Sequence, residues 1–548
     1  MRSNAPFPIV VALACALVAT AEACGGDTHA PGDPLRTIPP NAEVVIVAPS
    51  VTKVQAAATA FLDGLPGAPG VLDLLAERYG LDLRTPEGVA SLGIDPARAA
   101  TVWTREGTII VAVAVRDARV FGAHVEQRLV RGAGGARVPG SPEAWEAPRV
   151  VDGPPPPGSA DGRPLWRAGW SVTPDGIGLL ALTGGDGDPA AQCVTATRDV
   201  HHFGDEPAGP YAKAREVGGQ DALLYMIVGD ILPPTPGGLG LLQGFVDNVR
   251  KGLGRWYGGV ALSGERVALR LASDFSGEGE LPVSWVALPG GADVIARVLP
   301  KTTSALMRFR INLGKLRALP GFIVSQFLPD QIPGFEALPI PALPDLVDLL
   351  EGDVGVAFLG LDPKATFGHL TSLRALRERA LETFRVALVA RLRDAEGARR
   401  QFAGIADQLS QSGWVVAPLQ VAQAGGWTGW TFVRGATSYS VLIDPEVIVF
   451  IVGPGEVDAF IAARAGRATT LAQYGAGFDA TLQEALGLSP AGGATALGIS
   501  LGFLRVTREL ADKGVPPFFL KMLSRIKLVG LSLDAQPKRV TIGLEVAR

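Results

Sequence analysis

Several stretches of the chain alternate hydrophobic and polar residues, which is typical of β-strands with one covered face and one wetter face. The clearest is RVTIGLEVA at residues 539–547, and similar patterns occur at 265–273 and 384–392. Four residues of the first stretch are expected to share one face of its strand: Val540, Ile542, Leu544 and Val546. Alternation of this kind favours antiparallel sheets.

A longer spacing of hydrophobic residues predicts helices between these strands. In residues 394–410 the hydrophobic positions recur at helical intervals, at Phe402, Ile405, Ala406 and Leu409. Such a stripe is the side that an amphipathic helix turns towards a core. Strands of period two combined with amphipathic helices predict the α+β class.

Aspartate residues stand where predicted strands give way to turns or helices. An Asp side chain accepts hydrogen bonds from free backbone N–H groups at a helix start, and Pro suits the first helical position. We therefore expect Asp117 and Asp394 to cap helices. Asp95 and Asp362 each precede a Pro, and we expect them to be turn or cap residues as well. The alternative is a pair of catalytic carboxylates, which requires Asp95 and Asp362 to meet in one cleft.

An internal duplication is predicted by landmarks that recur in the same order. The paired segments are 38–54 with 299–316, 92–96 (LGIDP) with 359–363 (LGLDP), 111–129 with 386–409, 166–170 (WRAGW) with 427–430 (WTGW), and 255–273 with 525–546. A period this long exceeds that of solenoid repeats, so each copy is a domain-sized unit. The predicted fold is α+β, with two repeated units, 38–280 and 281–548, each a mainly antiparallel sheet with helices packed on one face.

The first residues have the features of an export signal. A short basic start precedes the hydrophobic stretch PIVVALACALVAT, and small residues lead up to Cys24. We interpret residues 1–23 as a signal peptide and Cys24 as a lipidated first residue, followed by a flexible tether over 24–37. The alternative is ordinary cleavage after Ala23, which yields a secreted protein without a lipid.

The composition argues against one class of binding partner. The 548 residues include 50 basic and 54 acidic side chains, and 47% are hydrophobic. Such a balanced charge without a basic stripe argues against a nucleic-acid partner. Cys15 belongs to the signal, so once Cys24 is lipidated Cys193 is left without a disulfide partner, and we expect it to be a small buried residue.

Candidate chemistry is sparse. The adjacent His201 and His202 are weak candidates for metal ligands, and the alternative is a polar surface loop. Tryptophans recur in the fourth landmark pair, and they are weak candidates for lining an apolar ligand site, against the alternative of core packing: Trp166, Trp170, Trp427 and Trp430. The sequence shows neither a phosphate-binding loop nor a nucleophile elbow, so we expect no catalytic residue and no cofactor.

Three features together resemble a known group of proteins: AEACGG around Cys24, the VVIVAPSV opening at 44–51 and the twin LG-[IL]-DP elements. The chain resembles the large uncharacterised bacterial lipoproteins of deltaproteobacterial type that carry a duplicated domain of unknown function. The resemblance implies an envelope location and supplies no activity.

The sequence thus predicts a non-enzymatic cell-envelope lipoprotein with a binding or scaffolding role. The expected location is the outer membrane, facing the periplasm or the cell surface, with the membrane contacted through the lipid anchor and an envelope protein or apolar ligand as partner. A first alternative is a carrier of lipid or another apolar ligand in a cleft between sheet and helices. A second is a hydrolase whose site assembles from distant residues.

Overall fold

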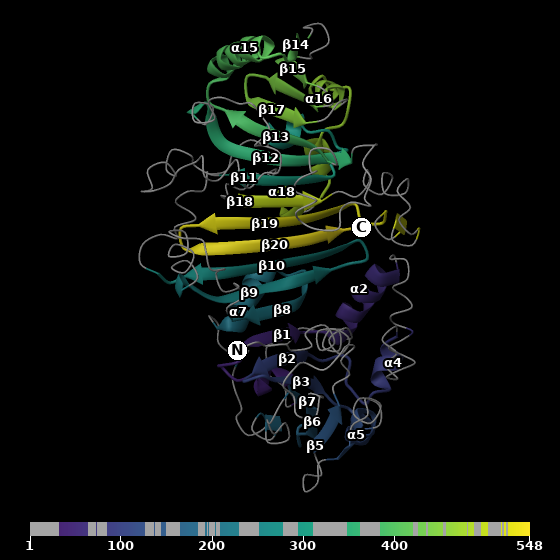
Figure 1. Cartoon of the computed structure of the whole chain (residues 1–548). Coiled ribbons are helices and arrows are strands. Elements are labelled where there is room, and N and C mark those ends of the chain that lie inside the picture. Colours follow the sequence, from purple (N-terminus) through teal and green to yellow (C-terminus); the bar gives the residue numbers. More distant parts are fainter. Residues whose placement is uncertain are drawn as a thin grey trace. The chain divides into compact units, whose positions relative to one another are not determined.

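The structure is a computed structural model (Figure 1). It describes residues 32–63, 73, 85–126, 136–137, 144–148, 165–184, 192–193, 196, 203, 209–229, 251–277, 294–310, 348–361, 384–419, 426–434, 437–452, 456–478, 480–486, 495–501, 517, 520–521 and 524–548. The chain divides into two compact units. Unit 1 comprises Met1–Pro234 and Gly254–Ser273, and unit 2 comprises Thr235–Leu253 and Asp274–Arg548.

Unit 1 is built on an antiparallel sheet. Its strands are β1 (Val44–Ala48), β2 (Ala100–Arg105), β3 (Thr108–Ala114), β4 (Ala136–Arg137), β5 (Ala144–Pro148), β6 (Leu165–Val172), β7 (Ile177–Gly184), β8 (Ala222–Val228), β9 (Leu253–Leu262) and β10 (Arg266–Phe275). Neighbouring strands pair in the order β4-β5-β6-β7-β3-β2-β1-β8-β9-β10. The β2–β3 hairpin turns through Glu106 and Gly107, both at positive φ.

Helices cover both faces of the unit 1 sheet. They are η1 (Pro34–Thr37), α2 (Val51–Asp63), α4 (Pro86–Ala90), α5 (Ala118–His124) and α7 (Pro210–Gly218). On one face α2 and α5 contribute Val51, Val54 and Phe121 to a hydrophobic core. On the other face η1 and α7 contribute Leu35 and Ala214 to a second core.

Unit 2 has strands β11 (Ala305–Arg310), β12 (Leu350–Leu361), β13 (Phe384–Leu392), β14 (Val415–Pro418), β15 (Thr428–Arg434), β16 (Thr437–Ile443), β17 (Val447–Val452), β18 (Thr495–Leu501), β19 (Leu528–Gln536) and β20 (Arg539–Ala547). They pair in the order β14-β15-β16-β17-β13-β12-β11-β18-β19-β20, all antiparallel. Its helices are α10 (Val294–Val298), α15 (Ala395–Gln411), α16 (Val457–Arg464), α17 (Leu471–Gly475) and α18 (Ala480–Leu486).

The α+β class and the antiparallel sheets are confirmed in both units. The helices are not confined to one face, however. In unit 2, α15 packs on one face of the sheet, and α10, α16, α17 and α18 pack on the other. Among the described residues, no helix is long and hydrophobic enough to cross a bilayer.

The two strand orders are related simply. Adding ten to each strand number of unit 1 gives the order of unit 2. Two of the sequence landmarks do not fit this correspondence. Leu92–Asp95 precedes β2, whereas Leu359–Leu361 ends β12, and the Trp-containing segments lie on β6 and at β15, which are not equivalent strands. A short motif matched by letters alone can therefore fall on different strands.

The predicted helix caps are confirmed. The Asp117 carboxylate accepts hydrogen bonds from the backbone N–H groups of Arg119 at 2.9 Å and Val120 at 3.1 Å. The Asp394 carboxylate accepts one from Gly397 N–H at 2.8 Å, at the start of α15. The predicted stripe of α15 is buried, comprising Phe402, Ile405, Ala406 and Leu409.

Removing the Asp394 cap is expected to weaken α15. Asp394→Ala leaves an N–H group of the first turn unsatisfied, which destabilises such helices by about 1 kcal/mol. Hydrogen exchange of the α15 amides reports the change, which should be confined to that helix. Asp394→Ser is the matched control because its hydroxyl can still accept the hydrogen bond. Equal exchange in wild type and Asp394→Ala would show that the cap does not stabilise the helix.

The body begins earlier than the predicted tether allows. Gly32 donates its N–H to the Asp175 carboxylate at 3.2 Å, and Asp33 accepts a hydrogen bond from Leu35 N–H at 3.0 Å to cap η1. Leu35 and Thr37 are buried. Residues 32–37 of the predicted 24–37 tether are therefore packed on unit 1, because Leu35 and Ile38 belong to its core.

Candidate functional site

One face of the unit 2 sheet carries hydrophobic side chains that no described helix covers. The opposite face lies under α18, whose Leu482 and Leu486 share a core with Leu306 of β11. Since side chains alternate along a strand, the neighbours of Leu306 point away from α18. We call this surface the apolar face, and it comprises Met307, Phe309, Val356, Phe358, Val386, Leu388, Val529, Leu531, Leu533, Ile542, Leu544 and Val546.

Strand register aligns these residues in rows across the sheet. Met307 lies opposite Val356, and Val356 lies opposite Leu388. On the other side Leu531 lies opposite Leu544. Backbone pairing through Ile499 of β18 joins Met307 to Leu531. Five strand spacings give this row a length of about 24 Å.

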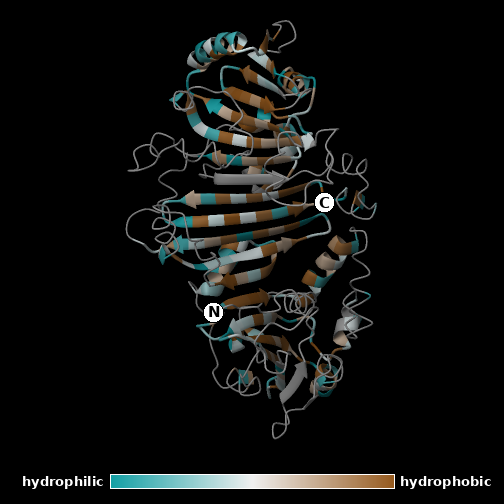
Figure 2. Cartoon of the chain, viewed as in Figure 1, coloured by the Kyte–Doolittle hydropathy of each residue, from teal (hydrophilic) through white to brown (hydrophobic). Residues whose placement is uncertain are grey.

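The two most exposed side chains described on the apolar face lie in its middle row. Met307 is 40% exposed and Leu544 is 39% exposed, whereas Glu545, next to Leu544 in the chain, is only 1% exposed. The predicted alternation of 539–547 is present, but the more buried side is the one that carries Gly543 and Glu545. Figure 2 shows the resulting stripes of hydrophobic and paler residues along β19 and β20.

Close packing of α18 explains this reversal. A Cβ added to Gly530 would lie 2.5 Å from Leu482 Cδ2, so a larger residue there would require Leu482 of α18 to shift. Gly530 pairs with Glu545, and Ser532 pairs with Gly543 on the same face. Gly530, Ser532 and Gly543 therefore lie with the buried Glu545 on the helix-covered face, and large hydrophobic residues of β19 and β20 occupy the other face.

The equivalent face of unit 1 is covered. Val51 and Val54 of α2 pack there with Ala48 and Val102, and Phe121 of α5 belongs to the same core. In unit 2, Phe402 of α15 shares a core with residues of β13, β16 and β17, so this helix covers that part of the face. The unit 2 segment that corresponds to α2, residues 311–347 between β11 and β12, lies outside the described residues.

A buried ion pair lies under the helix-covered face of unit 2. Arg308 donates to both carboxylate oxygens of Asp353, from Nε at 2.8 Å and from Nη2 at 2.5 Å. Its Nη1 donates to the carbonyl of Leu486 at 3.1 Å, which ties the end of α18 to the sheet. Arg308 fits because its cross-strand neighbours are Gly355 and Gly498.

Arg310 extends this cluster. Its Nε lies 3.9 Å from an oxygen of Asp353, and its side chain is 6% exposed. Burial lowers the pKa of the Arg310 guanidinium, and the charge of Asp353 opposes that shift. The three charges are held between sheet and helices, so the arrangement fixes the fold of unit 2 locally rather than presenting a reactive group.

The tryptophans proposed for ligand binding lie in or against cores where they are described. Trp170 packs edge-on against Phe121, with ring centroids 6.4 Å apart. Trp427 is 3% exposed, and Trp430 packs against the α15 core. The side chain of Trp166 lies outside the described residues. The described indoles therefore pack against cores, and the apolar face was missed because its residues look like ordinary strand interior.

Other predicted residues are placed as follows. Asp95 accepts a hydrogen bond from Ala97 N–H at 3.1 Å and lies 3.3 Å from Arg116, so it is a turn residue as expected. Cys193 is buried, as expected, and its thiol donates to the Gly169 carbonyl at 3.6 Å.

Cys24, His201, His202 and Asp362 lie outside the described residues. Within the described part of the chain, no three His, Cys, Asp or Glu side chains gather to hold a metal.

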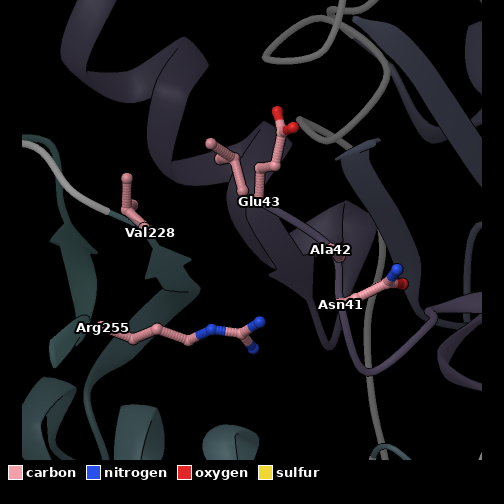
Figure 3. A pocket seen from close by; sticks show the side chains of 7 residues that line it. Asn41, Ala42, Glu43, Val228 and Arg255 are labelled. Carbon is pink, nitrogen blue, oxygen red and sulfur yellow. The ribbon is translucent and has the colours of Figure 1, made fainter. Parts of the chain in front are cut away.

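Unit 1 has an open pocket of about 430 Å³ at the start of β1 (Figure 3). Arg255 lines it and donates to the Pro40 carbonyl at 3.0 Å. Glu43 also lines it, but its carboxylate points away from Arg255 (Figure 3). The other lining residues carry no charge: Asn41, Ala42, Val44, Val228 and Gly229.

Comparison with known proteins adds little to this geometry. No protein-family model matches the chain, and no curated protein matches it. Among solved structures, the one described as "Structure of crystal form IV of TP0453" shares 9% identity, covering 49% of this chain and 85% of that chain with a TM-score of 0.24. A likeness of this size supports no conclusion about fold or function.

Proposed function

We propose that the chain is an exported, non-enzymatic protein of the cell envelope, anchored by a lipid on Cys24, with a binding or scaffolding role. The apolar face of unit 2 carries the binding part of this proposal. Covering hydrophobic surface gains about 25 cal/mol per Å². Hydrophobic side chains can supply such affinity, but they cannot donate or accept a proton, so this face fits binding better than catalysis. Large exposed hydrophobic patches mark protein or membrane interaction sites.

The exposure of Met307 and Leu544 favours a second candidate, a carrier of lipid or another apolar ligand. The sequence suggests a cleft between sheet and helices for such a ligand. In unit 2 that space is a packed core, as the approach of Leu482 to Gly530 shows. The ligand would therefore lie on the apolar face, on the opposite side of the sheet from α18.

Cys24→Ser is expected to abolish lipid attachment and to release the protein from membranes. A thioether to Cys24 holds the acyl groups, and a hydroxyl cannot replace it. Two measurements in a bacterial host that processes lipoproteins check this: incorporation of labelled palmitate, and the distribution between membrane and soluble fractions, with the outer membrane as the expected location of the wild type.

Cys193→Ser is the matched control, because Cys193 is buried in unit 1 and its replacement leaves Cys24 intact. This variant should keep both the label and the membrane association. A wild-type chain that is exported but carries no palmitate would instead establish the secreted form without an anchor.

A further inference from the structure

We propose that the lipid on Cys24 holds one end of unit 1 next to the headgroups of the membrane and leaves the opposite end of that unit facing away. We call the first the anchor end. It is formed by the turns at residues 95–98 and 173–176, beside Gly32. The inference rests on the proposed envelope function and names the surface of unit 1 that meets the lipid.

The start of the body is fixed to the anchor end. Gly32 donates its N–H to the Asp175 carboxylate at 3.2 Å. Its φ is +85°, and a Cβ added to it would lie 2.5 Å from the Asp175 carbonyl oxygen and 3.0 Å from Arg98 Nη1. Glycine alone combines a positive φ with so close an approach of another backbone. The position of Gly32 is therefore set by the two turns.

The two turns lie together at one end of the unit 1 sheet. Ile94, which precedes the first turn, bridges to Val115, and Val115 donates its N–H to the carbonyl of Gly176 in the second turn at 2.8 Å. The opposite end of the sheet carries the β2–β3 hairpin turn at Glu106 and Gly107. Between the two ends β3 has seven residues, which separate them by about 20 Å.

The length of the preceding chain limits how far the anchor end can lie from the lipid. From Cys24 to Gly32 the chain advances eight residues. A chain spans at most about 3.5 Å per residue, so Cys24 lies within about 28 Å of Gly32 whatever the conformation of the chain between them. Residues 32–38 do not add to this reach, because Leu35 and Ile38 are buried in a core of unit 1.

The exposed groups of the anchor end suit a headgroup layer rather than hydrocarbon. Pro174 and Asp175 are exposed in the second turn. The Arg116 side chain is 60% exposed and lies 3.3 Å from Asp95 of the first turn. A hydrogen bond from Thr173 lowers the pKa of the Asp175 carboxyl, which therefore stays ionised. Burying these charges in hydrocarbon is costly, so the anchor end lies against the headgroups without inserting.

The test attaches the lipid to Cys24 chemically, so the geometry is measured without processing in a cell. The chain from Cys24 onwards with Cys193→Ser is coupled through its thiol to a maleimide lipid in vesicles of phosphatidylcholine and phosphatidylglycerol. A donor dye is attached through an azide-bearing amino acid at one of two exposed positions, Ala97 in the anchor end or Glu106 at the opposite end. With a rhodamine lipid as acceptor, energy transfer should be higher from position 97 than from position 106.

A lengthened tether is the matched control. About twenty Gly and Ser residues inserted before Gly32 raise the limit on its distance from Cys24 to about 100 Å, so the difference between positions 97 and 106 should disappear. Equal transfer from the two positions in the original chain, or higher transfer from position 106, overturns the proposal. A difference that survives the insertion also overturns it, because a contact other than the short tether then orients the unit.

Gly32→Ala tests whether the start of the body is held as the structure shows. Alanine is strained at this φ, and its Cβ would collide with the backbone of the second turn, so the segment should detach there. In the chain without a lipid, the amides of Leu35 and Arg36 should exchange roughly ten-fold faster. Gly107→Ala is the control, because Gly107 also has a positive φ but an added Cβ would meet nothing within 4 Å. Unchanged exchange in Gly32→Ala, or an equal increase in Gly107→Ala, overturns the proposal.

These outcomes are separable from the anchoring result. Palmitate on Cys24 in the cell with equal transfer from both dye positions keeps the anchor and removes the orientation of unit 1. Higher transfer from position 97 on the coupled vesicles without palmitate in the cell shows the reverse, a body shaped for a short tether that the cell does not lipidate.

Discussion

Asp353→Ala is expected to destabilise unit 2 by about 3–5 kcal/mol, because it removes the carboxylate that the buried Arg308 donates to. Arg308 loses both hydrogen bonds to the carboxylate, and Arg310 loses the charge 3.9 Å from its Nε. Removing one partner of a buried pair costs far more than the pair itself contributes, since the remaining charge stays out of water. Hydrogen exchange of β11 and β12 amides, read alongside urea denaturation, measures the loss.

Two further variants are compared with Asp353→Ala to show that the loss of stability comes from the buried ion pair. Arg308→Met should cost less than Asp353→Ala, because Asp353 then keeps Arg310 as a neighbour. Arg399→Ala removes the half-buried partner of the exposed Glu396 on α15 and should change stability by less than about 1 kcal/mol. If Asp353→Ala behaves like Arg399→Ala, the cluster is hydrated and the account of a buried pair is wrong.

Phe402→Ala is expected to destabilise the α15 layer by about 3–5 kcal/mol. The Phe402 ring is 2% exposed and packs against Phe450 at 5.4 Å between centroids, so truncation leaves a cavity in the core beneath α15. The lost contacts and the unfilled volume add together, because the surrounding side chains relax only in part. Urea denaturation combined with hydrogen exchange of α15 and β17 measures the change.

Gly404→Ala on the same helix is the matched control of opposite sign. Gly404 is exposed, and an added Cβ would meet nothing within 4 Å. Alanine is the better helix former by about 1 kcal/mol, so this variant should be more stable than the wild type. A destabilised Gly404→Ala would show that α15 does not have the exposed side that the structure gives it.

Local features of the fold are predictable from the sequence because they depend on neighbours in the chain. The stripe that includes Phe402 and Ile405 is set by helical spacing, and the caps at Asp117 and Asp394 are set by hydrogen bonds spanning two or three residues. The alternation of hydrophobic and polar residues in 539–547 likewise predicts the strand β20 from neighbouring residues alone.

The candidate site is not predictable in this way, because it depends on register and on what covers each face. The hydrophobic Leu544 is exposed, whereas the charged Glu545 beside it is buried. The cause is α18, which comes from elsewhere in the chain and packs on Gly530, the cross-strand neighbour of Glu545. Arg308 is buried because Gly355 and Gly498 lie across from it, on strands remote in sequence. The one available signal was that β11 alternates Met307 and Phe309 with Arg308 and Arg310.

The tight contact between α18 and Gly530 has a consequence for how this protein can change over time. At Gly530 even one added methyl group would force the buried Leu482 side chain to shift, so substitution of this position is disfavoured. On the opposite side Leu531 and Leu533 have no such limit from α18, and their bulk can vary while the interior stays intact. The shape of the outer face of such a sheet can therefore change while its packing against the helices is preserved.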